Sequence, residues 1–323
     1  MLLLPLVLAA APVPVSIPLP GGPPVAMDYL AYDPVHERVW VPAGNTGRVD
    51  VIDARTGAVT AVAGFDTATV KGRDGREREI GPSAVGIGDG YAYVGDRAGA
   101  QVCAIDARTL ERKGCVALPS PPDGVAWVAT TREVWVTTPR DGAIAILDAR
   151  DGGAPRLAGR IPVEHPEGYA VDAERGLFYT NQEEEDRTLA IDVRRRAVVA
   201  RFSPGCGPDG PRGLALDAGR RQLFVACTTA IVALDAAGEG KVLGRLEVGA
   251  GVDNIDLLAS RHRVYAAAGR AGTLTVAEAG EAGGLTRLWS APAAEGGRVV
   301  VVDARGAAYV ADSRRGRILV FRE

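Results

Sequence analysis

Charged side chains recur at one position of a pattern that the sequence repeats along its length. The position lies five residues before the end of a short apolar run, and it holds Asp28, Ser83, Asp123, Glu167, Arg212, Asp253 and Arg298. Carboxylates can hold an ammonium group, a sugar hydroxyl or a hard cation, and arginine can grip a carboxylate or phosphate with parallel N–H donors. Brought together, these side chains would form a binding site of mixed charge for a small polar ligand or a protein partner.

A purely structural role accounts for the same residues. If the positions surround an opening filled with water, their acids and arginines can neutralise one another without holding a ligand. Asn181 ends the next apolar run of the fourth copy, and we expect it to lie near Glu167 in the same site.

The acids of the pattern also allow a metal-assisted reaction. Carboxylate and amide oxygens are the ligands that Ca²⁺ and Mg²⁺ prefer, and a metal-bound water could open a lactone. The sequence contains no lactonase motif, so we expect no cofactor and no catalytic residue. A hydrolase or lactonase dependent on calcium or magnesium is the alternative function.

Other catalytic chemistries lack their motifs. The chain has only 3 histidines, too few for a histidine-rich copper site, and a lone histidine is usually structural. There is no G-x-S-x-G elbow, no P-loop, no dinucleotide G-x-G-x-x-G and no C-x-x-C.

A second repeated feature, an apolar run that ends in an acid, indicates which secondary-structure elements position these residues. After an initial interval of 53 residues it recurs every 42 to 44 residues, at Asp53, Asp106, Asp148, Asp192, Asp235 and Glu278. Each unit contains short runs rich in Val, Ile, Ala and aromatic residues, bounded by Gly, Asp, Asn or Pro. A period near 40 to 45 residues with about four strands per unit is typical of a β-propeller. The sequence therefore predicts an all-β, seven-bladed propeller with four-stranded antiparallel blades, as one domain over residues 12–323.

The seventh copy stops after its third apolar run. Residues 15–20 near the N-terminus align with a fourth strand, so we expect this segment to close the last blade and cover its open edge. Prolines in the segment suit an edge strand, where a missing N–H does no harm.

The second run of each unit reads VWVPA, AYVGD, VWVTT, LFYTN, LFVAC, VYAAA or AYVAD. These tetrapeptide-like runs resemble those of the YVTN-repeat, or YncE-like, family of seven-bladed propellers, over nearly all of the chain after its N-terminal segment. The resemblance implies the fold and an exported protein, but no particular function. In a propeller the first strand of each blade is innermost, so the seven charged positions would meet at the mouth of the central channel.

Residues 1–11 form an apolar segment ending in alanines and resemble a secretory signal peptide. Export would favour two disulfides among the four cysteines. Cys103 and Cys115 flank a tight turn, and Cys206 and Cys227 would lie on one rim of a blade; four buried thiols are the other reading. We expect a periplasmic or secreted protein.

A net charge of −3 argues against a nucleic-acid partner, and no run is long enough to span a membrane. The densest basic stretch, residues 71–79, alternates arginine with acids, which favours a solvated loop.

Overall fold

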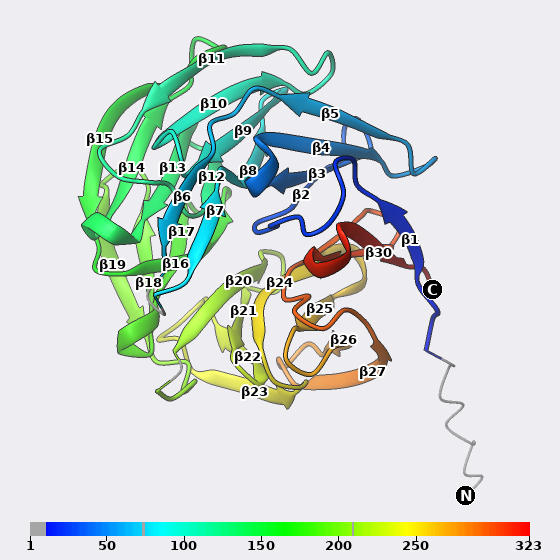
Figure 1. Ribbon diagram of the computed structural model, residues 1–323. Coiled ribbons are helices and arrows are strands. Elements are labelled where there is room, and N and C mark those ends of the chain that lie inside the picture. The colour runs from blue at the N-terminus through cyan, green and yellow to red at the C-terminus, as the bar shows by residue number, and fades with distance from the viewer. Residues whose placement is uncertain (1–10, 73–74, 209) are drawn as a thin grey trace, which may run out of the picture.

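The computed structural model describes residues 11–72, 75–208 and 210–323. They form seven antiparallel sheets of four strands each, arranged as blades around a central channel, together with one two-stranded hairpin (Figure 1). The predicted all-β, seven-bladed propeller is confirmed. Residues 1–10, which make up all but the last residue of the predicted signal peptide, lie outside the described residues.

Each of the first six blades is built from consecutive strands, and the first strands of neighbouring blades contact one another around the channel. Blades 1 and 2 consist of β2 (Ala31–Asp33), β3 (Arg38–Ala43), β4 (Arg48–Asp53) and β5 (Val59–Ala63), then β8 (Pro82–Gly88), β9 (Tyr91–Asp96), β10 (Gln101–Asp106) and β11 (Arg112–Ala117). Blades 3 and 4 consist of β12 (Val125–Val128), β13 (Glu133–Thr138), β14 (Ala143–Asp148) and β15 (Arg156–Pro162), then β16 (Pro166–Asp172), β17 (Leu177–Gln182), β18 (Arg187–Asp192) and β19 (Ala197–Phe202).

The remaining blades continue the same order. Blades 5 and 6 consist of β20 (Pro211–Asp217), β21 (Gln222–Cys227), β22 (Ala230–Asp235) and β23 (Val242–Glu247), then β24 (Val252–Leu258), β25 (Arg263–Ala268), β26 (Thr273–Ala279) and β27 (Leu285–Pro292). Blade 7 takes β28 (Val300–Val302), β29 (Ala308–Asp312), β30 (Arg317–Phe321) and β1 (Val15–Pro18). Short 3₁₀ turns lie between the second and third strands of four blades: η1 (Gly44–Thr46), η2 (Pro139–Asp141), η3 (Glu183–Glu185) and η5 (Ser313–Arg315). In blade 6, η4 (Ala259–Arg261) lies between the first and second strands.

The N-terminal strand closes the ring, as the sequence predicted. β1 pairs antiparallel with β30, with Val15 opposite Val320 and Pro18 opposite Arg317. Beyond the strand, the Leu19 N–H donates to the Gly316 carbonyl at 2.9 Å. The outer edge of β30 is thereby paired, which removes an open sheet edge from the last blade.

Every blade contributes a buried aromatic residue from its second strand to the hydrophobic core. All seven are less than 2% exposed: Trp40, Tyr93, Trp135, Tyr179, Phe224, Tyr265 and Tyr309. Each belongs to a different hydrophobic cluster, and each cluster joins one blade to the next. The repeated tetrapeptide of the sequence is therefore the unit of packing between blades.

Trp135 offers a direct test of this packing. The indole is 0% exposed, packs on Phe178 of the next blade with ring centroids 5.0 Å apart, and donates from Nε1 to Glu133 at 3.0 Å. We expect Trp135→Ala to lower the free energy of unfolding by about 3–5 kcal/mol in a denaturant titration, because it leaves a cavity between two blades. Val199→Ala, on the exposed side of β19, should change it by about 0.5 kcal/mol or less. A comparable loss from both variants would contradict the assignment.

The acid that ends each repeat unit shapes the turn between the third and fourth strands. Asp53 Oδ1 accepts the backbone N–H groups of Arg55 at 3.0 Å and Thr56 at 2.7 Å. Asp106 and Asp192 accept the corresponding N–H groups two and three residues on. These bonds replace hydrogen bonds that the tight turn leaves unmade, so the repeated acid has a structural role.

Both predicted disulfides are present, and the alternative of four buried thiols is wrong. Cys103 and Cys115 are directly opposite each other on β10 and β11 of blade 2, with Cα atoms 3.9 Å apart. Cys206 joins the loop after β19 to Cys227 at the end of β21, with Cα atoms 5.0 Å apart. Disulfides form and persist in oxidising compartments.

The disulfide of blade 2 holds the outermost strand onto the sheet. We expect the Cys103→Ala/Cys115→Ala variant to lose about 2–4 kcal/mol of unfolding free energy relative to the oxidised protein, because the link no longer restricts the unfolded chain. Denaturant titration with and without reducing agent measures the loss. The variant should be insensitive to reduction at this site, and an unchanged midpoint relative to the oxidised wild type would contradict the prediction.

The insertion that lengthens the first repeat is a β-hairpin, so the interpretation of residues 71–79 as a solvated loop is wrong. β6 (Ala68–Lys71) pairs with β7 (Glu77–Ile80), with Ala68 opposite Ile80. β7 contacts η1, and Figure 1 shows the hairpin extending across the front of the ring on the side of β16 and β17. Residues of the hairpin line the same cavity as Arg140 and His165. Its alternation of acids and bases suits a strand pair that is exposed to water.

Candidate functional site

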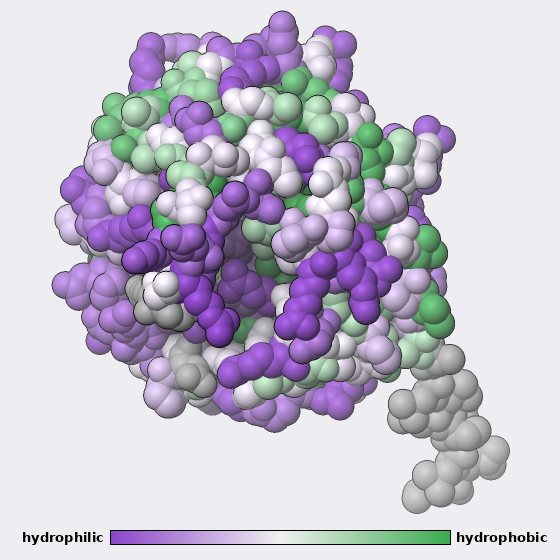
Figure 2. Space-filling model, viewed as in Figure 1, coloured by the Kyte–Doolittle hydropathy of each residue, from purple (hydrophilic) through white to green (hydrophobic). Residues whose placement is uncertain are grey.

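The predicted positions surround one face of the ring. Because strand direction alternates within a blade, the start of the first strand lies on the same face as the turn between the second and third strands. On this face a cavity of about 1080 Å³ opens, and Figure 2 shows it as a hollow with hydrophilic walls at the centre of the ring. Its walls include Asp28, Ser83, Asp123 and Arg298.

Arg212 and Asp253 line an adjoining cavity of about 420 Å³, to which Arg298 also contributes. The wall of the larger cavity continues onto the inserted hairpin through Val70, Lys71 and Glu79. Six of the seven positions predicted from the repeat therefore border one composite opening, which we call the mouth.

An arginine that the repeat argument did not predict links two of the acids. Arg97 follows the last residue of β9, and its Nη2 lies 3.1 Å from Asp28 Oδ2. The same group forms an ion pair with Asp123 Oδ1. Burial alone would lower the pKa of Arg97, but the negative charges of Asp123 and Asp28 have the larger effect, so the pKa of Arg97 rises. Arg97 therefore neutralises the acids of blades 1 and 3.

The predicted arginines are also paired. Arg298 Nη1 lies 2.8 Å from Asp253 Oδ2, and its Nη2 lies 3.9 Å from Asp28 Oδ2. Asp28 and Asp253 together raise the pKa of Arg298. Arg212 Nη2 lies 2.6 Å from Glu183 Oε1 in η3, and Arg212 Nη1 lies 3.8 Å from Asp253 Oδ1. Acids and arginines thus alternate around the mouth.

Sequence reasoning missed Arg97 and Glu183 as members of the site. Both lie just after the second strand of a blade, in the turn that faces the mouth. The repeated tetrapeptide could have indicated them. The second strand ends with the tetrapeptide, so the chain turns one or two residues later, on the face of the ring where the first strand begins. Glu183 belongs to the acidic run NQEEEDR, in which Asn181 and Gln182 are buried and only Glu184 and Glu185 are exposed.

Glu167, the seventh position, lines neither of the two cavities and differs from the acids that do. None of the described residues donates a hydrogen bond or forms an ion pair with its carboxylate. Burial, followed by the charges of Asp123 and Asp253, raises its pKa well above the usual range. Tyr29 lies at the same point: its hydroxyl accepts the Gly168 N–H at 3.2 Å, and burial and then Glu167 raise the pKa of Tyr29.

The raised pKa of Glu167 predicts how the stability of the protein depends on pH. Between the usual glutamate pKa and the raised one, the folded protein holds a proton that the unfolded chain has lost, so stability falls as pH rises. We expect Glu167→Gln to escape this loss, and its free energy of unfolding should rise relative to the wild type as the pH increases above the usual glutamate pKa. The matched control Glu278→Gln, on the exposed face of β26, should show a constant difference. Parallel curves for Glu167→Gln would contradict the prediction.

Asn181 lies beside the mouth, but its side-chain amide forms hydrogen bonds within the fold. It is 0% exposed; its Nδ2 donates to the Arg212 carbonyl of blade 5, and its Oδ1 accepts from Thr188 Oγ1 at 2.6 Å. Gly168 packs at the same point with φ of +58°, and a Cβ there would lie 2.2 Å from the Arg212 oxygen. Asn181 is directly opposite Glu167 in the β16–β17 pair, so it lies near that acid as the sequence predicted, and a role in binding a ligand stays a prediction.

A further cavity lies inside the ring, between the first strands of the blades. Tyr29 stacks on Tyr169 with ring centroids 6.1 Å apart, and both line a cavity of about 430 Å³ inside the ring. Asp256 also lines it and accepts the backbone N–H groups of Val302 at 2.7 Å and Leu257 at 2.8 Å. Burial raises the pKa of Asp256 to about 6.

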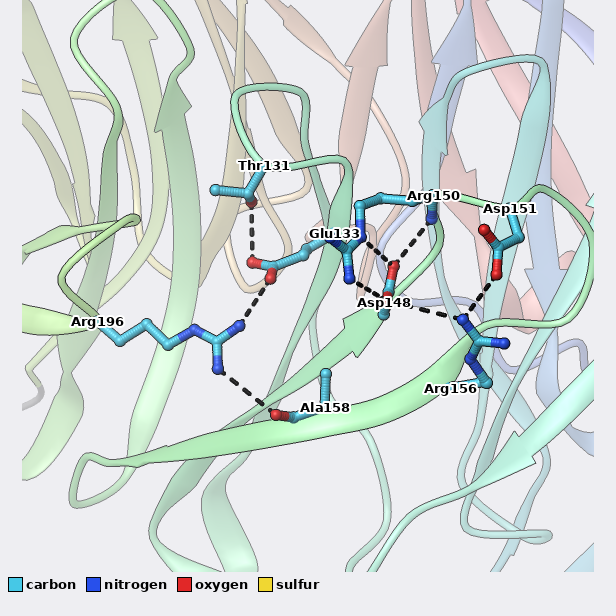
Figure 3. A network of polar contacts seen from close by, with 8 residues as sticks. All are labelled: Thr131, Glu133, Asp148, Arg150, Asp151, Arg156, Ala158 and Arg196. Atoms are coloured by element: carbon cyan, nitrogen blue, oxygen red, sulfur yellow. Dashed lines mark hydrogen bonds and ion pairs between the residues drawn. The ribbon is translucent and has the colours of Figure 1, made fainter.

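Charge pairs also occur on the opposite face, where they join blades. In Figure 3 Glu133 accepts from Thr131 at 2.8 Å and pairs with Arg196 of the next blade at 2.7 Å. Asp148 accepts both Nε and Nη2 of Arg150. A paired acid and arginine are therefore not in themselves a sign of a binding site, and only the cavity and the unpaired groups distinguish the mouth.

Two searches of the described residues complete the description. No group of three or more histidine, cysteine or acidic side chains in residues 11–72, 75–208 and 210–323 could hold a metal ion. None of the helices in those ranges is long and apolar enough to cross a membrane.

Known proteins resemble the chain in fold. A chain of the mitotic checkpoint complex matches with a TM-score of 0.76 at 16% identity, over 98% of this chain and 93% of that one. The WD40 repeats of RRP9 match with a TM-score of 0.76 at 10% identity, over 97% and 98%. Hydrazine synthase of Kuenenia stuttgartiensis matches with a TM-score of 0.73 at 14% identity, over 94% and 96%. No family model and no curated protein matches the sequence.

The strand topology and these similarities define the class of the protein: it is a seven-bladed β-propeller. Identities of this size show the fold alone, and a propeller fold hosts many functions. The more specific resemblance to the YVTN-repeat family stays a prediction from the sequence.

Proposed function

We propose that the protein is an exported, non-enzymatic propeller of the YVTN-repeat type that binds a small polar ligand or a protein partner at its mouth. One observation carries the proposal: charged side chains from five blades border a single opening of about 1080 Å³ with its adjoining cavity. Pockets with a few convergent polar groups and shifted pKa values are the usual places for ligands. Asp28, Asp123, Glu167, Arg212, Asp253 and Arg298 are the proposed contact residues.

The role of a binding protein agrees with the architecture. A rigid ring positions the mouth residues through hydrogen-bonded strands and paired charges, so little has to be ordered when a ligand binds. Among the structures of similar fold is a member of a multiprotein assembly, the mitotic checkpoint complex. By analogy, a protein partner is proposed here beside a small molecule.

Export is the second part of the proposal. The disulfides Cys103–Cys115 and Cys206–Cys227 take up all four cysteines, which is the pattern of a protein that matures in an oxidising compartment. Together with the apolar N-terminal segment they support a periplasmic or secreted location.

The calcium- or magnesium-dependent hydrolase is not proposed, because no observation favours it. Asp28, Asp123 and Asp253 each face an arginine. Each of these carboxylates already has a positive partner, with which a divalent cation would have to compete. A nucleic-acid partner is likewise not proposed, since the net charge is −3.

A thermal-unfolding screen tests the proposed site. The panel holds amines, amino acids, carboxylates, sugars, phosphate esters and short charged peptides. The variants are Glu167→Gln/Arg212→Ala at the mouth and Glu278→Gln/Arg194→Ala, which makes the same charge changes on exposed residues of the opposite face. We expect at least one compound to stabilise the wild type and the opposite-face variant, by ~2.7 kcal/mol at 100 times its Kd, and not the mouth variant.

Two outcomes would contradict the proposed function. Either no compound stabilises the wild type, or those that do stabilise the mouth variant equally well. Circular dichroism of both variants before the screen shows that each is folded, so that a lost shift reports lost binding.

A further inference from the structure

Two buried oxygen atoms of the mouth have no hydrogen-bond partner among the described residues. They are Ser83 Oγ and Asp123 Oδ2. The residues are 6% and 9% exposed, lie on neighbouring blades and line the same cavity. Burying an acceptor without a donor costs free energy, so these oxygens call for a donor that enters from the cavity.

The Glu167 carboxylate, on the next blade, is a third acceptor. Its strand contacts blade 3 close to Asp123, where the Tyr169 hydroxyl donates to the Val125 carbonyl at 2.6 Å, although Glu167 itself lines neither cavity. Asp123 is the charge that acts most strongly on it, and Asp253, Glu183 and Asp28 add to the effect, together with the nearby hydroxyl of Tyr29. Blades 2, 3 and 4 thus each present one acceptor, from Ser83, Asp123 and Glu167. We call this set the recess.

The charges around the recess favour a cation. Five acids of the mouth, Asp28, Asp123, Glu167, Glu183 and Asp253, face three arginines, Arg97, Arg212 and Arg298. The arginines are engaged with Asp28, Asp123, Asp253 and Glu183, and Glu167 is left without a partner. A primary ammonium carries one positive charge and three donors and no acceptor, which matches one unpaired carboxylate and three oxygen acceptors.

The outer wall of the same cavity has the opposite character. Lys71 of the hairpin and Arg140 of η2 line it, and neither forms an ion pair with another described residue. Arg314, also on this wall, is paired with Glu295 at 2.8 Å, and Glu79 adds one acid. A bare cation would meet these exposed bases before it reached the recess.

We propose that the mouth holds a zwitterionic ligand, whose primary ammonium enters the recess of Ser83, Asp123 and Glu167 while its anionic end faces Lys71 and Arg140. This rests on the proposed function, because it names the ligand class of the same site. A free amino acid with separated charges and a lysine side chain beside an acidic residue in a peptide share this chemistry.

Binding should couple to the ionisation of Glu167. The ammonium attracts the charged carboxylate, so a proton leaves Glu167 as the ligand binds, and the affinity rises with pH through the raised pKa. Asp123, Asp253, Glu183 and Asp28 remain around the group in both states.

Calorimetric titration at low salt with 6-aminohexanoate tests the proposal. Hexanoate lacks the ammonium and hexylammonium lacks the carboxylate, so both should bind at least about tenfold more weakly. Glu167→Gln should weaken 6-aminohexanoate by a similar factor and abolish the rise in affinity between about pH 5 and about pH 8. Ser83→Ala should weaken it less, because a neutral acceptor is lost. Glu278→Gln on the opposite face is the matched control and should bind as the wild type does.

A blocked peptide, acetyl-lysyl-glycyl-aspartyl-amide, distinguishes the two sources of the ligand. Binding of either compound that depends on Glu167 supports the proposal, and the tighter one identifies the source. Equal binding of hexanoate and 6-aminohexanoate, equal weakening by Glu278→Gln, or no binding of either zwitterion would overturn it. The proposed function would still stand if another compound of the screen bound in a way that depends on the mouth.

Discussion

The structure depends on apolar contact between neighbouring blades. A four-stranded sheet with two apolar faces cannot exist alone in water, and each blade buries its faces only against the blades before and after it. Trp40, Tyr93 and the equivalent aromatic residues supply that contact seven times around the ring. Because the last interface needs the first blade, the ring has to close, and β1 on β30 is the strand pair that completes the last sheet.

The same constraint produces the mouth. Once seven first strands are packed around an axis, the residues at their beginnings crowd one small circle. Charges there lose part of their hydration, so acids and arginines alternate, as in the series Asp123, Arg97, Asp28 and Arg298. Burial raises the pKa of Asp123, Asp253 and Glu167, but arginines oppose the effect at Asp123 and Asp253, whereas no arginine pairs with Glu167 among the described residues.

The fold could be predicted almost completely from the sequence because it is periodic. The spacing of Asp106, Asp148 and Asp192 set the blade length, and the short seventh copy indicated the closing strand. The two disulfides followed from strand order, since residues that flank a hairpin face each other. The inserted hairpin was not predicted, because its alternating charges hide the pairing of β6 with β7.

The site was less predictable, because its contacts join different copies of the repeat. Periodicity places Asp28, Asp123, Arg212, Asp253 and Arg298 on one circle, and the cavities are lined by these residues. It does not say that Arg97 reaches back to Asp28, nor that Asn181 turns its amide to the Arg212 carbonyl. Such contacts depend on side-chain length and on the angle between blades, which no single unit encodes.

The way β1 is joined to β30 also has a mechanical consequence. Val15, at the start of β1, is opposite Val320, near the end of β30, so both chain ends leave the sheet from the same end of the strand pair. A force that pulls the two termini apart peels the strands from one end, so it loads the hydrogen bonds of this pair one after another rather than all at once in shear. The ring is therefore weakest under tension at the joint that completes it, although that joint is protected by the whole sheet against thermal opening.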